Sequence, residues 1–126
     1  MIEFNPGEVA KILDADIWRA KRTIAFAAFT RIAGRTPVDT GTARNNWAVS
    51  AGEPDRTIKA APGTPGAMPM MAAVAEAPPG GNINVPLYIT NNLPYIVPLE
   101  QGHSRQAPGG MVDLTLAELQ SGMIDL

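Results

Sequence analysis

Three side chains with catalytic potential, Asp39, Glu100 and His103, stand in the two most distinctive stretches of this 126-residue sequence. Two carboxylates and an imidazole could act as general acids and bases in a small hydrolase. The alternative is structural, because Asp39 in "RTPVDTG" can cap the following turn by accepting a hydrogen bond from the amide of Gly41 or Thr42. His103, in "LEQGHSR", can likewise close a turn. One carboxylate pair among twelve acids is weak support for catalysis, so we favour the structural interpretation.

Other kinds of reactive site find less support in the sequence. The chain has no cysteine and one histidine, without an HxxH spacing, which argues against a closed zinc site. No serine lies in a nucleophile elbow, and the residues around Asp39 lack the Gly-x-x-x-x-Gly-Lys pattern of a phosphate loop. We therefore predict a protein that is not an enzyme and that needs neither a metal nor a cofactor.

Length and composition narrow the class of protein. A chain of 126 residues predicts one compact domain, residues 1–126. The net charge of −2 argues against a general nucleic-acid binder. No apolar run approaches the roughly 18 residues that a membrane span needs, and the N-terminus lacks the basic and apolar blocks of a secretory signal. We expect no membrane association and synthesis in the cytoplasm.

The charge is distributed unevenly. Between Trp18 and Trp47 the only acid is Asp39, whereas the rest of the chain is strongly acidic. This basic window suits charge-matched assembly or a surface that faces phosphates, and a solvated helix face is the simpler alternative. Its members are Arg19, Lys21, Arg22, Arg31, Arg35 and Arg44.

A long N-terminal helix should position many of these residues. Asn5 and Pro6 form a helix start, and the apolar periodicity predicts a helix to about Ala33, with Gly34 as its stop. The apolar positions fall on two sides, so one side can pack on a sheet while the other needs a partner. The first set is Val9, Ile12, Leu13, Ile17, Ala20, Ile24 and Ala27, and the second is Trp18, Ala25, Phe29 and Ile32. The predicted subunit interface consists of Trp18, Phe29 and Ile32 with the later Met68, Met70 and Met71.

The remaining residues predict a small sheet and two further helical segments. Alternation makes Ile83–Asn92 the clearest strand, and Pro86 places it at a sheet edge or bulge. Residues 51–82 read as an extended loop or hairpin insertion, rich in proline and glycine. The other predicted elements are strands at Asn46–Ser50 and Arg56–Ala60, a short helix within Met70–Ala77, a helical turn at Tyr95–Gln101 and a final helix from Val112. The expected class is α+β, with a long N-terminal helix and a C-terminal helix packed on a small antiparallel sheet.

The stretch "RTPVDTGTARNNW" then predicts a helix-to-strand junction. Pro37 fixes the exit from the helix, Asp39 and Thr40 close the turn, and Trp47 returns the chain to the core. Arg44 is the member that we expect to point toward a neighbouring molecule.

Two stretches also resemble a known family. "TPVDTGTARNNW" (Thr36–Trp47) resembles the "TPVDTG…R…W" signature of the head–tail joining and tail-completion proteins of long-tailed bacteriophages. "ITNNLPYIVPLEQGHSRQAPGGMV" (Ile89–Val112) resembles the later block of that family, which precedes its last helix. The segment "QAPGGMVDL" departs from the family, because it is acidic and glycine-rich where a basic segment is usual. The matching residues are Thr36, Pro37, Val38, Asp39, Thr40, Gly41, Arg44, Trp47, Asn91, Pro94, Tyr95, Glu100, Gly102, His103 and Ser104.

This resemblance implies a structural virion protein of the neck or tail top, either a tail-completion, terminator or minor tail protein. Such a protein would work as an oligomeric ring and would be incorporated into the virion after assembly in the host cytoplasm. Its partners would be copies of itself, the tail tube protein and the head connector or stopper proteins, with viral DNA nearby in the lumen. The alternatives are a small hydrolase that uses Asp39, Glu100 and His103, and a module that captures a strand along the Ile83–Asn92 edge.

Overall fold

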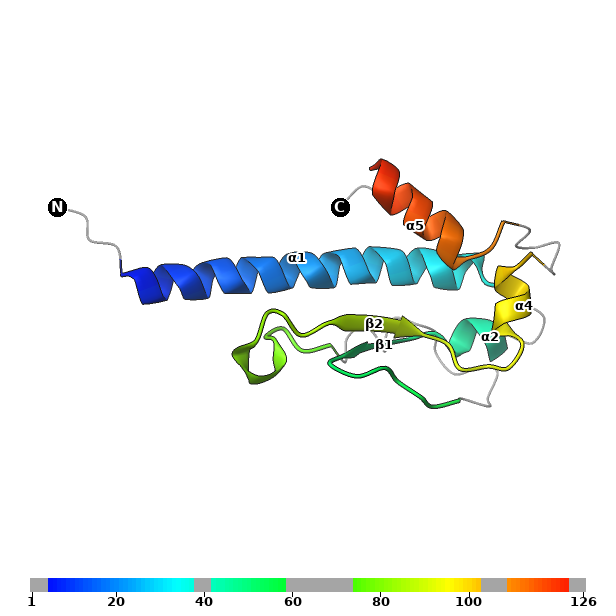
Figure 1. Ribbon diagram of the computed structural model, residues 1–126, viewed down its shortest axis with the longest axis horizontal. Helices are drawn as coiled ribbons and strands as arrows, with labels where there is room; N and C mark the ends of the chain where they lie inside the picture. Colours follow the sequence, from blue (N-terminus) through cyan, green and yellow to red (C-terminus); the bar gives the residue numbers. More distant parts are fainter. Residues whose placement is uncertain (1–4, 38–41, 59–73, 103–108, 123–126) are drawn as a thin grey trace.

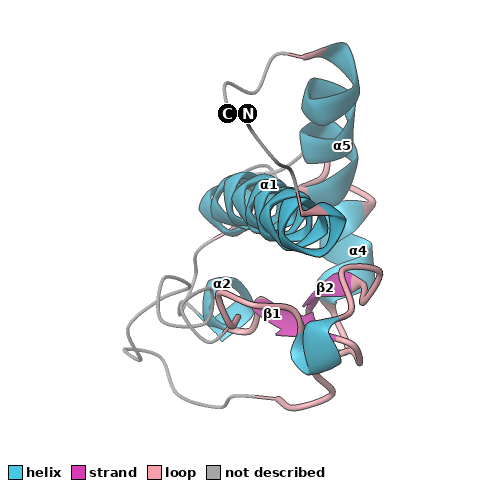
Figure 2. Ribbon diagram, turned by 90° about the vertical axis from the view of Figure 1, so that its left-hand side faces the viewer, coloured by secondary structure: helices cyan, strands magenta, loops and turns pink. Residues whose placement is uncertain are grey.

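The computed structural model describes residues 5–37, 42–58, 74–102 and 109–122. It has an α+β fold in which a two-stranded antiparallel sheet lies on one side of a long helix and a shorter helix lies on the other (Figures 1 and 2). The predicted fold class is therefore confirmed. The elements in order are α1 (Pro6–Arg35), α2 (Thr42–Asn45), β1 (Ala48–Ala51), the 3-10 helix η1 (Pro79–Gly81), β2 (Leu87–Thr90), α4 (Ile96–Glu100) and α5 (Val112–Ser121).

Helix α1 begins as the sequence predicts and ends differently. The side chain of Asn5 accepts a hydrogen bond of 2.9 Å from the amide of Gly7, and Pro6 occupies the first turn. Gly34 lies inside the helix, so its predicted role as the stop is wrong. The helix ends because Thr36 precedes Pro37, whose ring disfavours helical backbone at the residue before it, and Thr36 is extended, with ψ at 128°.

The sheet is smaller than the alternation in the sequence predicts. Strand β1 pairs with β2 from Ala48 opposite Thr90 to Ala51 opposite Leu87. The ladder stops beyond the bond from the Gly52 amide to the Pro86 carbonyl, because Pro86 has no N–H to donate in return. Predicted strand residues before Pro86 instead enter a turn, and the described residues 56–58 of the predicted Arg56–Ala60 strand have no regular structure.

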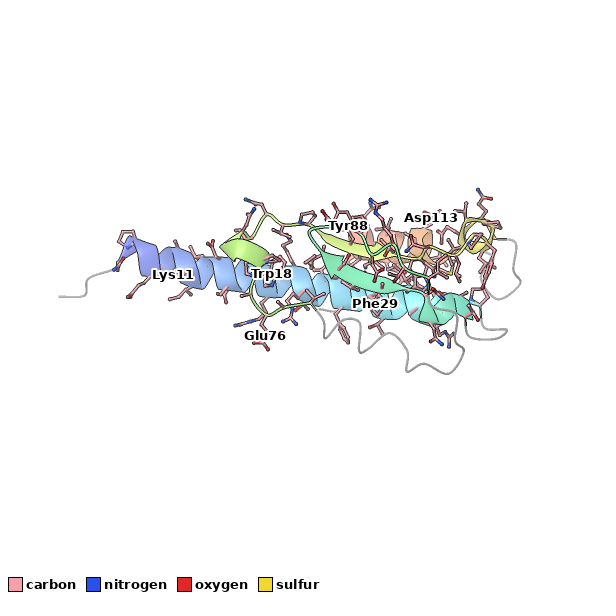
Figure 3. The ribbon with its side chains drawn as sticks, turned by 90° about the horizontal axis from the view of Figure 1, so that it is seen from below. Lys11, Trp18, Phe29, Glu76, Tyr88 and Asp113 are labelled. Atoms are coloured by element: carbon pink, nitrogen blue, oxygen red, sulfur yellow. The ribbon has the colours of Figure 1, made fainter. Side chains whose placement is uncertain are left out.

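The core lies between α1 and the sheet. Trp18 and Phe29 are fully buried there, and Trp47, which precedes β1, and Val49 of β1 are buried beside them. Figure 3 shows Trp18 and Phe29 along the part of α1 that the strands and their flanking segments cover. Every second residue from Val85 to Ile89, namely Val85, Leu87 and Ile89, packs against this core, in agreement with the alternation in the sequence.

The two apolar sides of α1 were correctly separated, but their predicted roles were reversed. Trp18, Phe29 and Ile32 are 0 %, 0 % and 4 % exposed, so the prediction that they form a subunit interface is wrong. The physical reason is that the aromatic side buries the larger area against the sheet. The opposite side remains exposed, and the predicted interface residues Met68, Met70 and Met71 lie outside the described part of the chain.

The later helices match their predictions in position. The predicted turn at Tyr95–Gln101 is α4, and α5 carries Asp113 in its first turn. On the inner face of α5 Thr115 is buried, whereas Leu116 is 48 % exposed. In the 51–82 segment the described residues 74–77 are not helical, which contradicts the predicted Met70–Ala77 helix there, and η1 follows at Pro79–Gly81.

We predict that Trp18→Ala lowers the free energy of unfolding by about 3–5 kcal/mol, because it empties a fully buried site. The neighbouring change Ile17→Ala is a matched control, since Ile17 is 46 % exposed, and it should cost less than about 1 kcal/mol. Urea denaturation of both variants measures the difference. Equal losses would contradict this assignment of the two sides of α1.

Candidate functional site

The first family-like stretch forms a locked junction at the C-terminus of α1. The Thr36 hydroxyl donates to the Ile32 carbonyl at 2.8 Å and accepts from the indole N–H of Trp47 at 2.7 Å. Both side chains are buried, so the bond joins the end of the helix to the start of β1 away from water. The predicted return of Trp47 to the core is confirmed, and Thr36 acquires a role that its spacing did not reveal.

Arg44 belongs to the same junction. Its guanidinium donates at 3.2 Å to the carbonyls of Gly34 and Thr36, where the last turn of α1 leaves acceptors unsatisfied. A cation is also favoured at that end of a helix dipole. Arg44, which we expected to point toward a neighbouring molecule, therefore binds carbonyls of its own chain.

The two family-like stretches contact each other. The side-chain amide of Asn91, which follows β2, donates at 2.9 Å to the carbonyl of Ala43 in α2. Its oxygen accepts from the amide of Leu93 at 3.1 Å and so shapes the turn toward α4. The later stretch therefore holds the earlier one in place through backbone groups.

Glu100 caps α5 with its carboxylate. One oxygen accepts from the amides of Met111 and Val112 at 2.8 and 2.9 Å, and the other accepts from Asp113 at 2.9 Å. These amides are the unsatisfied donors of a helix N-terminus, where the dipole also favours a negative charge. Gly110 makes the approach feasible, because an added Cβ would lie 2.7 Å from the Glu100 carbonyl and the φ angle is +85°.

This capping role weakens the hydrolase hypothesis. Both carboxylate oxygens of Glu100 accept hydrogen bonds from backbone amides, and these three bonds use most of the acceptor positions of the group. The other two members of the trio, Asp39 and His103, lie outside the described residues, as do Val38, Thr40, Gly41 and Ser104. Among the residues that the structure does describe, no group of three or more potential metal ligands occurs.

The other motif residues shape the backbone around α4. Pro94 and Tyr95 are exposed in the turn that leads into the helix, and Tyr95 is its N-terminal cap residue. Gly102 follows the helix with a positive φ of 87°, and Pro37 follows Thr36 at the exit from α1.

The basic window is largely occupied by contacts within the chain. On α1, Lys21 donates to the carbonyls of Ile83 and Val85 at 2.9 and 2.6 Å, and Arg22 donates to Val74 at 2.9 Å. The indole of Trp18 adds a 2.9 Å bond to the carbonyl of Ala75. These donors fasten a segment without strands of its own to the helix.

Two further arginines hold α5. Arg31 and Arg35 both form ion pairs with Glu118, and Arg35 also donates to the buried hydroxyl of Thr115 at 2.9 Å. Arg19 is the member of the window that projects into solvent, where it faces Asp16 at 3.7 Å. The expectation of a basic surface facing phosphates therefore finds little support among these side chains.

An exposed apolar stripe is the most distinctive surface of the described chain. The N-terminal half of α1 extends beyond the sheet and α5 (Figure 1), and Lys11 there has no strand beside it (Figure 3). We name as the outer stripe the apolar side chains on the face of α1 opposite Trp18, which are 38–63 % exposed. Its members are Val9, Ile12, Leu13, Ile17 and Ile24.

The outer stripe leads into a shallow groove between α1 and β2. The groove encloses about 280 Å³ and is lined mainly by apolar side chains: Lys21, Ile24, Ala25, Ala28, Leu87 and Ile89. Exposed apolar surface of this extent marks a contact with another molecule more often than an isolated exposed side chain does. Within the described part of the chain, no helix has both the length and the apolar character needed to cross a bilayer.

No protein-family model, curated protein or solved structure matches this chain. The interpretation therefore depends on the geometry above and on the resemblance of the two stretches.

We predict that Thr36→Val lowers the free energy of unfolding by about 1–3 kcal/mol, because it leaves the buried indole N–H of Trp47 without an acceptor. Thr23→Val is the matched control, since the Thr23 hydroxyl makes the same kind of bond to a carbonyl four residues earlier but is exposed. Its effect should stay within about 0.5 kcal/mol. A Thr36 variant as stable as the control would show that the junction is not locked in this way.

We also predict that Glu100→Gln destabilises the chain by about 1–3 kcal/mol, because an amide cannot accept three backbone bonds as a carboxylate does. The exposed Glu53→Gln removes the same charge and should leave stability unchanged within about 0.5 kcal/mol. Thermal unfolding followed by circular dichroism measures both. An unchanged unfolding temperature for Glu100→Gln would show that the Glu100 carboxylate does not stabilise the chain by capping α5.

Proposed function

We propose that this chain is a structural, non-enzymatic protein of a bacteriophage neck or tail top. In this proposal several copies form a ring that completes the tail and joins it to the head connector. The partners are copies of the chain, the tail tube protein and the connector or stopper proteins, and the site of action is the virion. The proposed name of the role, whether completion, terminator or minor tail protein, rests on the resemblance alone.

The observation that carries the proposal is the use of the motif side chains. Thr36, Arg44, Trp47, Asn91 and Glu100 all bind groups of their own chain, and together they fasten α1, β1 and α5 into one scaffold. Side chains used in this way support a framework more than a reaction centre. The outer stripe supports the second half of the proposal, because a framework with an exposed apolar helix face is suited to assembly.

A module that captures a strand is the second candidate function, and one observation supports it. Each strand of the described sheet pairs with a neighbour on one side only, so each has an open edge. The apolar groove beside Leu87 and Ile89 lies next to β2. An extended peptide could add to that edge.

Deleting the gene from the genome that carries it tests the proposed function. We expect heads and tails that fail to join, and electron microscopy of lysates should show the two separated. The wild-type chain should restore joined particles, and so should His103→Gln, which a hydrolase dependent on His103 could not do. Joined and infectious particles without the chain would overturn the proposal.

A further inference from the structure

The open edge of β2 carries outward backbone groups at every second residue. Gly52 donates a hydrogen bond to the carbonyl of Pro86, and the two lie opposite each other in the continuation of the β1–β2 register. Hydrogen-bonded pairs alternate along an antiparallel ladder, so Tyr88 also directs its N–H and C=O groups toward β1. The N–H and C=O groups of Leu87 and Ile89 therefore point away from β1, where the described residues supply no third strand.

The chain itself limits this edge at both ends. Before β2, Val85 donates its N–H to the carbonyl of Asn82 at 3.2 Å, and the carbonyl of Val85 accepts from the ammonium of Lys21 at 2.6 Å. After β2, the side chain of Asn91 accepts from the amide of Leu93 and turns the chain toward α4. Within the described chain, the outward residues of β2 itself remain available for pairing.

We propose that the open edge of β2 pairs with the same edge of a second copy of this chain. The two β2 strands run antiparallel, with a two-fold axis beside Tyr88. Leu87 of each copy then lies opposite Ile89 of the other, and every outward donor meets an outward acceptor. Because both copies use the same surface, the pair closes at two copies and is a form of the free chain. The inference therefore goes beyond the proposed function and does not rest on it.

The length of the edge favours a second copy over a longer strand. A copy presents an edge of the same length, so neither strand of the pair leaves outward groups of β2 unpaired. Pro86 lies opposite Thr90 of the second copy, where neither residue forms a bond between the copies, so the missing N–H of Pro86 has no cost. A longer strand would instead reach Val85, whose N–H and C=O groups are already bound.

The absence of charge around β2 also favours pairing between identical strands. A two-fold axis brings identical side chains together, so a charge beside it would repel its own copy. No charged residue occurs between positions 77 and 99 of the sequence. Charged side chains commonly protect an edge strand from such pairing, and β2 has none. Lys21 of α1 lines the adjacent groove, where carbonyls of its own chain hold its ammonium.

The side chains of β2 suit the same pair on both faces of the sheet. On the face toward α1, Leu87 and Ile89 line the apolar groove with Ile24 and Ala28, and the same strand residues of the second copy lie beside it. On the other face, Tyr88 lies across the axis from Tyr88 of the second copy, and aromatic cross-strand pairs stabilise sheets. A two-stranded sheet is marginally stable by itself, so the continuous sheet of the pair also supports each small one.

Amide hydrogen exchange tests the pair at single residues. In dilute solution the amide of Tyr88, which bonds to β1, should exchange slowly, and those of Leu87 and Ile89 should exchange fast. Above the dissociation constant we expect both outward amides to exchange at least about tenfold more slowly, because the pair bonds them. Val49 is the matched control, since its amide faces away from β2 on the other strand, and its rate should change less than about threefold. Sedimentation should show the 13.3 kDa chain at twice its mass.

Charges at Tyr88 supply a second measurement. Tyr88→Lys places like charges across the axis and should weaken the pair about three- to tenfold. Tyr95→Lys is the matched control, because Tyr95 is exposed before α4, and it should change the dissociation constant less than about threefold. Mixing Tyr88→Lys with Tyr88→Glu should restore association, since the charges across the axis then attract. Circular dichroism should show that all these variants are folded.

Unchanged exchange of Leu87 and Ile89 in a chain that associates would overturn the proposal, and so would a chain that stays monomeric at its highest soluble concentration. Slower exchange of Val49 together with Leu87 would replace the two-fold pair by head-to-tail pairing of β1 with β2. Protection of the outward amides only after tail tubes are added would assign the edge to a tail protein instead. Each of these results leaves the particle-joining test untouched, so failure of the pair and failure of the proposed function are distinguishable.

Discussion

The mismatch in length between α1 and the sheet governs this structure. A helix of 30 residues spans about 45 Å, whereas strands of four residues span roughly 13 Å. The sheet can therefore cover only part of one side of the helix. The positions of Trp18 and Phe29 select the part that is covered, and the N-terminal half is left projecting from the body.

Polar side chains compensate for the small sheet. Lys21 and Arg22 bind carbonyls of the segment before β2, which has few backbone bonds of its own. Arg44 binds a backbone carbonyl at the end of α1, and Glu100 binds backbone amides at the start of α5. Hydrogen bonds from charged groups are stronger than those between neutral ones, which suits them to fastening irregular backbone. The same use explains why so little of the basic window faces outward.

The sequence predicts the helices of this fold well and the polar contacts that hold them poorly. Local patterns predicted α1, α4 and α5 within one or two residues, because caps, prolines and periodicity act over short distances. The partners of Arg44 and Glu100 could not be predicted, since a carbonyl or amide that needs a partner carries no mark in the sequence. In the sequence, the glycine at position 110 was a signal for a close backbone contact before α5, which Glu100 makes. The proline after Thr36 was a signal for the end of α1.

By itself the sequence determined the α+β class, the long helix with two apolar sides and the scarcity of reactive groups. Only the tertiary structure decided which side of α1 is core and which is free, because both sides are apolar and periodicity ranks neither. The choice was made by the side chains that the strands and their flanking segments present to the helix, where Trp47, Val49 and Leu87 pack in one core cluster with Trp18 and Phe29. Likewise, only the tertiary structure showed that Glu100, one of the three candidate catalytic side chains, caps α5.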